Sequence, residues 1–363
     1  MSPLSSGDAA RALTFFRPDG VLESVEPLGQ GNINDSWRVS LADGTQWVLQ
    51  RLHPAVFADP GAVMANMRIV TDHLGRNPEQ RYVFFRLATT PQGQDHWIDS
   101  SGCCWRLLTH IDRTRTLGSL KNPAQAREIG RLLGRFHLLT ADLDPATLAD
   151  PLPDFHITPR CLAHYDAVCA GLQGTARQEN PQEVFCRALI ETLRPTAAIL
   201  EEARGRLSQR VIHGDPKAAN FLFAADADRA VSLIDFDTVK PGLLLHDLGD
   251  CLRSCCNPQG ESHADPAATA FDPDLFEAIM QGYLEQAGPL PTSADQALLV
   301  TSAAVISFEL GLRFFTDHLA GDRYFKVDRP GQNLHRALVQ FHLQQSIQAQ
   351  QGDLERRLAG LTR

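Results

Sequence analysis

The spacing of hydrophobic and polar positions changes character once along the chain. From about residue 12 to residue 112, short runs rich in β-type side chains are bounded by glycine, Asp-Gly and Pro-Gln-Gly turns, which predicts strands. A single helix is predicted after Asp59, because this residue can cap a helix that begins at Pro60 and apolar residues then recur at helical spacing. The predicted strands are 29–39, 46–52, 82–87, 95–98 and 104–109.

After Pro123 the period becomes helical. Residues 124–140 place their apolar side chains on one face, and further helices are predicted at 182–205, 273–287, 293–320 and 333–360. We therefore predict an α+β protein of two lobes: residues 1–111 form a small N-lobe built on an antiparallel sheet, and residues 112–363 form a larger, mostly helical C-lobe.

Composition supports two lobes and narrows the class of protein. A chain of 363 residues is too long for one ordinary core. Hydrophobic residues make up 43% and charged residues 21%, which argues against disorder. The net charge of -9, without a block of Lys or Arg, argues against nucleic-acid or membrane-surface partners.

Neither a membrane span nor a zinc site is indicated. The first 16 residues lack a basic segment followed by an apolar one, and the longest apolar stretch, 297–308, is too short for a span and predicts a buried helix. A cytoplasmic location is the expectation. The eight cysteines include no C-x-x-C pair, and Cys251 and Cys255 are one helical turn apart, so reduced core cysteines are expected.

The most informative motif is His213-Gly214-Asp215-Pro216-Lys217-Ala218-Ala219-Asn220, with Asp235 fifteen residues after Asn220 at the end of an apolar strand. The first run matches the H-x-D-x-x-x-x-N pattern of a kinase catalytic loop, and Asp235 stands where D-F-G would be. Asp215 is predicted to orient a hydroxyl group and accept its proton, and Lys217 to offset charge on the transferred phosphoryl group. Asn220 and Asp235 supply oxygen ligands for Mg²⁺.

Two neighbouring residues have predicted structural roles. His213 is expected to hydrogen-bond to backbone and shape the loop. Asp247 is expected either to cap the helix that follows it or to anchor the catalytic loop by accepting backbone N–H bonds, and contact with the substrate is the alternative to these structural roles.

The strand-rich half carries the candidate nucleotide contacts. Gly29 and Gly31, with Asn32 and Asn34, form a loop whose backbone N–H groups can approach phosphate oxygens; a plain hairpin turn is the alternative. ATP is the predicted cofactor together with Mg²⁺, and the connection from Thr109 to Ile111 is predicted to offer backbone groups to adenine.

The third predicted strand departs from the kinase pattern, since Gln50 stands where a V-A-I-K segment has lysine. Three possibilities remain open: Gln50 uses its amide on the phosphates, a bulge swings Arg51 inward, or another cation serves. Arg51 as an ordinary surface charge is a further alternative.

These residues resemble the aminoglycoside phosphotransferase/choline kinase family of small-molecule kinases. Within it, segments 31–35, 153–159, 234–242 and 313–325 resemble N-acetylhexosamine 1-kinases, and the resemblance spans about residues 10–345. It implies a two-lobed protein-kinase-like fold and transfer of the γ-phosphoryl group of ATP to the anomeric hydroxyl of N-acetylglucosamine or N-acetylgalactosamine.

The same resemblance makes Asp215 the catalytic base, Asn220 and Asp235 the metal ligands, and Arg313 and Tyr324 sugar contacts, with Thr238 as a further candidate. Without it, Arg313 would be interpreted as a helix-surface charge and Tyr324 as a core aromatic residue.

Three functions remain open from sequence. The leading hypothesis is an ATP- and Mg²⁺-dependent N-acetylhexosamine 1-kinase. The second is a kinase for another small alcohol or amino sugar, and the third is a nucleotide-binding pseudokinase scaffold, which the missing lysine at Gln50 favours. The expected partners are the sugar and ATP alone, and the sequence distinguishes neither gluco from galacto acceptors nor monomer from dimer.

Overall fold

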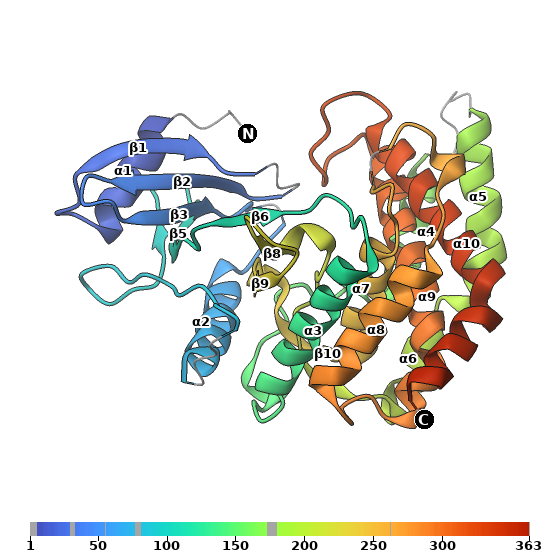
Figure 1. The fold of residues 1–363 in the computed structure, drawn as a ribbon. Coiled ribbons are helices and arrows are strands. Elements are labelled where there is room, and N and C mark those ends of the chain that lie inside the picture. Colours follow the sequence, from blue (N-terminus) through green and yellow to red (C-terminus); the bar gives the residue numbers. More distant parts are fainter. Residues whose placement is uncertain are drawn as a thin grey trace. The chain divides into compact units, whose positions relative to one another are not determined.

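The chain forms two compact units. The computed structural model describes residues 6–29, 33–54, 56–76, 81–172, 180–261 and 263–362. Unit 1 consists of Met1–Arg113 and Leu148–Pro151, and unit 2 of Thr114–Thr147 and Leu152–Arg363 (Figure 1). The short segment of unit 1 is held by Asn66, whose amide Nδ2 donates to Ala149 O (2.8 Å) and whose Oδ1 accepts from Ala149 N (2.9 Å).

Unit 1 is built on an antiparallel five-stranded sheet with the order β1-β2-β3-β5-β4. Side chains alternate between the two faces of a strand, and one face is apolar here. Helix α1 (Ser6–Phe16) contributes to the core on that face, together with Trp37, Val39, Leu49, Trp105 and Leu107. The strands are β1 (Leu22–Pro27), β2 (Asp35–Leu41), β3 (Gln46–Arg51), β4 (Trp97–Ile98) and β5 (Cys104–Thr109).

The strand predictions succeed in the middle of the sheet and fail at its edges. The strand predicted at 104–109 is present with the same bounds, and that at 46–52 ends one residue early. The strand predicted at 29–39 begins only at Asp35, and β1 precedes it. Residues 82–87 do not form a strand: of these, only Leu87 makes a bridge, to Leu108 of β5.

The predicted helix of unit 1 is α2 (Pro60–Arg76). Asp59 Oδ1 accepts a hydrogen bond from Ala62 N (3.0 Å), so the predicted N-terminal cap is confirmed.

Unit 2 is mainly helical, with two small antiparallel sheets, β6-β8-β9 and β10-β7. The helices predicted at 124–140, 273–287, 293–320 and 333–360 are confirmed within two residues. The one predicted at 182–205 is interrupted around Pro195, which cannot donate a helical hydrogen bond. The elements are β6 (Thr114–Thr116), α3 (Pro123–Leu139), α4 (Thr158–Gly171), α5 (Pro181–Leu193), α6 (Ile199–Ala203), β7 (Gln209–Ile212), β8 (Phe221–Ala224), β9 (Ala230–Leu233), β10 (Lys240–Leu243), α7 (Leu244–Cys255), α8 (Pro273–Ala287), α9 (Ser293–Leu319) and α10 (Gln332–Leu361).

Glycines allow α3 and α8 to cross at very short distance (Figure 1). A Cβ atom on Gly130 would lie 1.9 Å from the carbonyl oxygen of Ile279, and one on Gly282 would lie 2.1 Å from that of Arg127. No other residue fits at either position without separating the helices.

Helix α9 is the apolar centre of unit 2. Its length and composition alone would suffice to cross a membrane, but 72% of its most apolar window is buried inside the protein. It packs against α4, α7 and α10. The prediction of a buried helix is therefore confirmed. The expectation that it is too short to span a membrane is wrong, because the helix extends well beyond residues 297–308.

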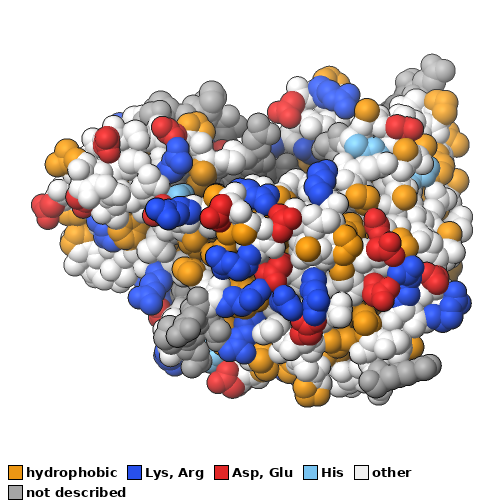
Figure 2. Space-filling model, in the orientation of Figure 1, with side chains coloured by type: hydrophobic (Ala, Val, Ile, Leu, Met, Phe, Trp, Pro, Cys, Tyr) orange, Lys and Arg blue, Asp and Glu red, His pale blue; other side chains and the backbone are white. Residues whose placement is uncertain are grey.

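Charged side chains of both signs lie next to each other over α3 and α8 (Figure 2). Glu285 pairs with both Arg127 and Arg131, and Arg131 also pairs with Glu128 at 2.9 Å. These arginines are thus neutralised locally.

Candidate active site

The predicted catalytic loop follows β7 and is anchored by Asp247. The two carboxylate oxygens of Asp247 accept hydrogen bonds from the backbone N–H groups of His213 and Gly214, each at 2.7 Å. His137 of α3 donates to the same carboxylate at 2.8 Å. Burial opposes the charge of Asp247, but these partners outweigh it and keep its pKa below the ordinary value. The anchoring role is confirmed; the capping role is wrong, because Asp247 lies inside α7.

His213 shapes the loop, as predicted. Its Nε2 donates to Ile234 O at 2.9 Å, and its Nδ1 accepts from the backbone N–H of Asp215 at 3.2 Å. Burial lowers the pKa of His213, which favours this neutral, singly protonated ring.

Asp215 and Lys217 form a close ion pair. The Lys217 ammonium donates to Asp215 Oδ2 at 2.5 Å, and the two side chains are only 23% and 30% exposed. Burial would raise the pKa of Asp215, but the Lys217 charge outweighs it, so the pKa lies below the ordinary value. Burial likewise opposes the charge of Lys217, but Asp215 and then Asp235 raise its pKa. Asp215 is therefore ionised and able to accept a proton.

Thr238 packs against the same loop. Its hydroxyl donates to His213 O at 2.9 Å. Gly214 has a positive φ of 87°, and a Cβ atom there would lie 2.5 Å from Thr238 O, so glycine is required. The Thr238 hydroxyl already donates its proton to His213, so it could contact a sugar only as a hydrogen-bond acceptor.

The hairpin β8–β9 brings Asn220 and Asp235 to one end. Phe221 is paired with Leu233, and Ile234 N donates to Asn220 O at 2.9 Å. Asp235 follows at once in a left-handed conformation with φ 70° and ψ 66°. The Nδ2 group of Asn220 donates to the backbone oxygen of Asp215 (2.8 Å) and to its carboxylate (3.2 Å), which turns Oδ1 the other way.

These groups fit a divalent ion of the hard type. Asn220 Oδ1 and the Asp235 carboxylate are oxygen ligands, which Mg²⁺ prefers, and Mg²⁺ commonly takes few protein ligands alongside phosphate oxygens and water. Elsewhere in the described ranges, no three His, Cys, Asp or Glu side chains are grouped to hold a metal.

The predicted sugar contacts also lie together. The guanidinium carbon of Arg313, on α9, is 4.8 Å from the ring centre of Phe155, 5.6 Å from that of Tyr324 and 5.5 Å from that of Phe325. Arg313 Nη2 donates to the Tyr324 hydroxyl at 3.4 Å. Burial opposes the charge of Arg313, but surrounding groups, Asp215 among them, raise its pKa. Arg313 is thus within electrostatic reach of the catalytic loop.

Asp317 holds the turn that carries Tyr324. Its carboxylate accepts backbone hydrogen bonds from Arg323 and Tyr324 at 2.8 Å and from Phe325 at 2.9 Å. Asp317 was not among the residues predicted from sequence, although it lies within segment 313–325.

His156 connects segment 153–159 to the catalytic loop. It is buried with φ 64°, and its Nε2 donates to Gly214 O at 2.7 Å. Its other ring nitrogen lies 3.3 Å from Glu309, whose second oxygen accepts from the Thr158 hydroxyl at 2.7 Å. Burial opposes both charges, but the pairing raises the pKa of His156 and lowers that of Glu309. Neither residue was predicted from sequence to take part in the site.

Phe155, beside Arg313, is held by a buried lysine. The Lys240 ammonium donates to the carbonyl oxygens of Leu152 and Phe155, each at 3.0 Å. The aromatic partner of Arg313 is therefore fixed through its backbone.

A second acidic group near Asp215 was also missed. Arg253 is buried and pairs with Asp250 (2.8 Å) and Glu261 (2.5 Å). The Oδ2 atom of Asp250 is buried and has no hydrogen-bond partner among the described residues. Burial, with Asp215 adding to it, raises the pKa of Asp250.

In unit 1 the described candidate nucleotide residues are spread over several elements: Gly29 after β1, Asn34 before β2, Gln50 in β3, and Thr109 and Ile111 at and after the end of β5. Gly29 has φ 74°, while Gly31 and Asn32 fall outside the described residues. Asn34 Oδ1 accepts from the backbone N–H of His53 at 2.9 Å. Thr109 ends β5, and Ile111 follows two residues later.

Gln50 makes contacts across the sheet. Its Nε2 donates to Ser36 Oγ at 2.9 Å, and its Oε1 accepts from Arg106 Nε (2.9 Å) and Nη2 (2.6 Å).

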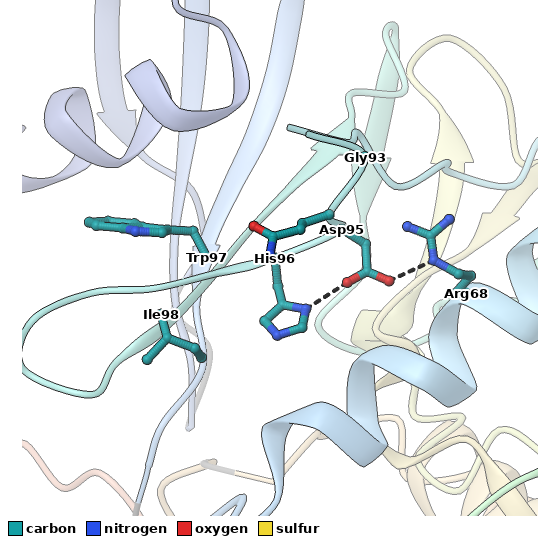
Figure 3. Close-up of a pocket in the computed structure, with 7 residues that line it drawn as sticks. Arg68, Gly93, Asp95, His96, Trp97 and Ile98 are labelled. Carbon is teal, nitrogen blue, oxygen red and sulfur yellow. Dashed lines mark hydrogen bonds and ion pairs between the residues drawn. The ribbon is translucent and has the colours of Figure 1, made fainter. Parts of the chain in front are cut away.

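A separate hollow of about 480 Å³ lies in unit 1 and is lined by Arg68 and residues 93–98. Figure 3 shows Asp95 between His96 and Arg68, each bonded to it at 2.6 Å. None of its lining residues is among the predicted site residues.

Comparison with known proteins bears on this arrangement. Residues 24–288 match the family described as Phosphotransferase enzyme family. Three similar solved structures have low sequence identity, so they show the fold alone, which is a protein-kinase-like α+β fold.

The first is a microcompartment-associated aminopropanol kinase, with 15% identity, a TM-score of 0.64, and 98% of this chain and 100% of that chain covered. An aminoglycoside phosphotransferase from Alicyclobacillus acidocaldarius has 16% identity, a TM-score of 0.59 and coverage of 99% and 98%. Amicoumacin kinase in complex with AMP-PNP, Ca²⁺ and Ami has 13% identity, a TM-score of 0.58 and coverage of 96% of this chain and 94% of that chain.

Proposed function

We propose that this chain, which belongs to the phosphotransferase enzyme family, is an ATP- and Mg²⁺-dependent small-molecule kinase whose acceptor is the anomeric hydroxyl of an N-acetylhexosamine. The observation that carries the proposal is the convergence of Asp215, Lys217, Asn220 and Asp235 in unit 2.

Asp215 acts on the acceptor. Its ionised carboxylate accepts the hydrogen bond of the sugar hydroxyl, aligns the oxygen with the γ-phosphorus and takes the proton as the bond to the leaving ADP oxygen breaks. Lys217 keeps Asp215 ionised and offsets negative charge on the transferred group.

Asn220 and Asp235 would hold the magnesium ion. When bound, Mg²⁺ neutralises phosphate charge and orients the terminal phosphate. The hydrogen bonds from Asn220 Nδ2 to Asp215 fix the metal-ligating amide and the acceptor-binding carboxylate relative to each other. The complex of amicoumacin kinase contains AMP-PNP and Ca²⁺, which supports the proposal that a protein of this fold binds a nucleotide together with a divalent ion.

The acceptor assignment rests on Arg313 and its aromatic neighbours. A neutral polyol is recognised by a few fixed polar groups, and a guanidinium fork can donate to two of its oxygens. Phe155, Tyr324 and Phe325 restrict the movement of that fork. A positive charge here disfavours a cationic acceptor.

One observation favours a second candidate, an amino alcohol or amino sugar. Asp250 places a buried carboxylate oxygen, without a hydrogen-bond partner among the described residues, near Asp215. An ammonium group would satisfy it. The aminopropanol kinase has the same fold, and its name indicates an acceptor of this kind.

The test is ADP release with Mg²⁺-ATP over a panel of N-acetylhexosamines, free hexosamines and amino alcohols, followed by phosphorus NMR of the product. We expect a sugar 1-phosphate from an N-acetylhexosamine only. Phosphorylated amino alcohols would support the second candidate, and ATP binding without turnover of any acceptor would indicate a pseudokinase.

Asp215→Asn provides the control for chemistry. It should lower kcat by about 10²- to 10⁴-fold while ATP binding is retained. Near-normal turnover in this variant would refute the assignment of Asp215.

A further inference from the structure

His156 is held in a backbone conformation that residues with a side chain rarely adopt. Its φ of 64° lies in the left-handed region, where the Cβ atom is crowded, and the residue is only 4% exposed. The proposed metal ligand Asp235 shares this feature, with φ 70°. A buried residue keeps such a conformation when its surroundings hold it there, and positions of this kind are concentrated at functional sites.

The ring of His156 connects the catalytic loop to α9. Its Nε2 donates to Gly214 O at 2.7 Å, and because a carbonyl oxygen can only accept, this nitrogen carries a hydrogen. Its Nδ1 has no aligned hydrogen-bond partner among the described residues but lies 3.3 Å from Glu309 Oε1, so this contact is an ion pair. The backbone N–H of His156 donates to the same oxygen at 3.1 Å.

One end of this connection fixes the peptide group from which Asp215 continues. Gly214 O belongs to the peptide group that joins Gly214 to Asp215. Because a peptide group is planar, a hydrogen bond to this oxygen also restrains the N–H and the Cα of Asp215. The backbone N–H of Gly214 donates to Asp247 at 2.7 Å. His156 and Asp247 therefore hold Gly214 from its two sides, immediately before the residue that is proposed to orient the acceptor hydroxyl.

The other end belongs to the proposed acceptor site. Phe155 precedes His156, and its ring centre lies 4.8 Å from the guanidinium carbon of Arg313. Glu309 and Arg313 are four residues apart on α9, so they lie on the same face of that helix. Lys240 holds the carbonyl oxygen of Phe155 at 3.0 Å. A shift of His156 would therefore displace the aromatic ring that restrains Arg313.

We propose that His156 is a positioning residue for phosphoryl transfer, which sets the separation between the acceptor site at Arg313 and the carboxylate of Asp215. The inference deepens the proposed function and rests on it, because it concerns how the acceptor is held in front of Asp215. A displacement of about 1 Å between reacting groups can lower a rate about 100-fold, so the effect should appear in kcat as well as in acceptor binding. All of these residues belong to unit 2.

The experiment compares His156→Asn with His156→Gln. Both replacements are neutral amides, but the longer Gln can place its Nε2 where the histidine has Nε2 and still donate to Gly214 O, whereas Asn is too short to reach it. Backbone preference has the opposite order, because Asn adopts a positive φ more readily than Gln. We therefore expect the Asn variant to be the more stable of the two and the Gln variant to be the more active.

Steady-state kinetics with Mg²⁺-ATP and the N-acetylhexosamine measure the effect on the reaction. His156→Asn should lower kcat about 10- to 100-fold and raise the acceptor KM about threefold or more, with the ATP KM within about twofold of wild type. His156→Gln should have a higher kcat than His156→Asn although its Tm is lower. His342→Asn is the matched control, because this partly buried histidine of α10 stacks on Phe185 of α5; its kcat and acceptor KM should equal those of wild type.

Hydrogen exchange of the Asp215 N–H measures the same connection without turnover. This N–H belongs to the peptide group whose oxygen His156 holds, and it donates to His213 Nδ1 at 3.2 Å. It should exchange about fivefold faster in His156→Asn, as expected for the loss of one hydrogen bond, and at about the wild-type rate in His156→Gln. Thermal unfolding identifies variants that do not fold. If one of the two does not, the exchange rate in His156→Gly, which removes the donor and adopts φ 64° without strain, decides the question.

The inference is overturned if kcat follows Tm, with His156→Asn closer to wild type than His156→Gln, because His156 would then act on stability alone. It is also overturned if the Asp215 N–H exchanges at the wild-type rate in His156→Asn. If wild type binds ATP but phosphorylates no acceptor, the proposed function fails, and the exchange rates alone decide whether His156 holds Asp215. If wild type phosphorylates only amino alcohols, the acceptor identity fails, and the order of the two variants on that acceptor is the test.

Discussion

Asp215 is surrounded by more positive charge than a single ion pair provides. Lys217 contacts it directly. The charge of Arg253 lowers the pKa of Asp215, and the charge of Asp215 raises the pKa of Arg313. Burial opposes the ionisation of a carboxylate, so these cations are what keep Asp215 charged at neutral pH. Lys217 and Asn220 both donate to the Oδ2 atom of Asp215. The acceptor hydroxyl would therefore have to share the Asp215 carboxylate with these two side chains.

Replacing Lys217 should change the pH dependence of activity. The pKa of Asp215 lies below 3.8 chiefly because of Lys217, so kcat/KM of the wild type should stay level as pH falls from about 8 to about 5. In Lys217→Met the pKa of Asp215 rises, and the acidic decline of kcat/KM should move to higher pH. Lys217→Arg, which keeps the charge, is the control. An acidic decline at the same pH in Lys217→Met and wild type would contradict this account.

Replacing Arg313 should affect the acceptor and spare the nucleotide. If Arg313 contacts the sugar as proposed, Arg313→Ala removes its charge-assisted hydrogen bonds to the acceptor, so the sugar KM should rise about tenfold or more while the ATP KM changes less than about twofold. Arg160→Ala is the control, because this arginine on α4 has a side chain that is 71% exposed. Steady-state kinetics with each substrate varied in turn would check it; a larger change in the ATP KM would remove Arg313 from the acceptor site.

At the scale of helices and strands, the elements predicted most accurately are those whose first residues carry a capping side chain. Helix α9 begins where Thr292 and Asp295 form a capping box, and α8 begins where Asp272 caps ahead of Pro273. By contrast α7 was expected only as a helix following Asp247, without bounds. Its polar positions recur at helical spacing, but in the structure all its residues except Ser254 are buried, charged ones included.

The same distinction holds for the candidate site. The spacing from Asp215 to Asn220 is fixed by one loop, so it could be recognised in sequence. His156 and Glu309 are 153 residues apart, and only tertiary packing brings them together.

The crossing of α3 and α8 gives a prediction about stability. Gly130→Ala places a methyl group where a carbonyl oxygen of Ile279 lies 1.9 Å away, so the helices must separate. Overpacking of this kind costs about 1–3 kcal/mol, and Tm should fall by about 2–4 °C per kcal/mol. Calorimetry of wild type and variant measures both quantities.

Gly352→Ala on α10 is the control for the change in helix propensity. The nearest atom to its Cβ is the end of the Arg356 side chain at 3.7 Å, so relief of backbone entropy should dominate and stabilise by about 0.5–1 kcal/mol. Equal Tm shifts of the same sign for both variants would show that the close crossing does not limit stability.

For the molecule as a whole, buried histidines make the free energy of unfolding depend on pH, and different histidines change it in opposite directions. Burial lowers the pKa of His213 and brings that of His246 down to about 4, whereas pairing with Glu309 outweighs burial and raises that of His156. A histidine with a raised pKa stabilises the folded state below about pH 6.5 and loses this contribution as pH rises. One with a lowered pKa destabilises the folded state increasingly as pH falls below about 6.5, because only the unfolded chain takes up the proton.

The contribution of His246 can be isolated with His246→Leu. Between about pH 7.5 and pH 5 the wild type should lose about 2 kcal/mol of unfolding free energy through this group, at about 1.4 kcal/mol per pH unit below 6.5. The variant lacks the titrating ring, so its unfolding free energy should fall by that much less over the same range. Urea unfolding at the two pH values measures the difference, and His164→Gln, at an exposed position of α4, should keep the wild-type pH dependence. If His246→Leu and wild type lose equal stability on acidification, then His246 is protonated in the folded protein. Its burial among His156 and Glu309 would then stabilise a charge rather than exclude one.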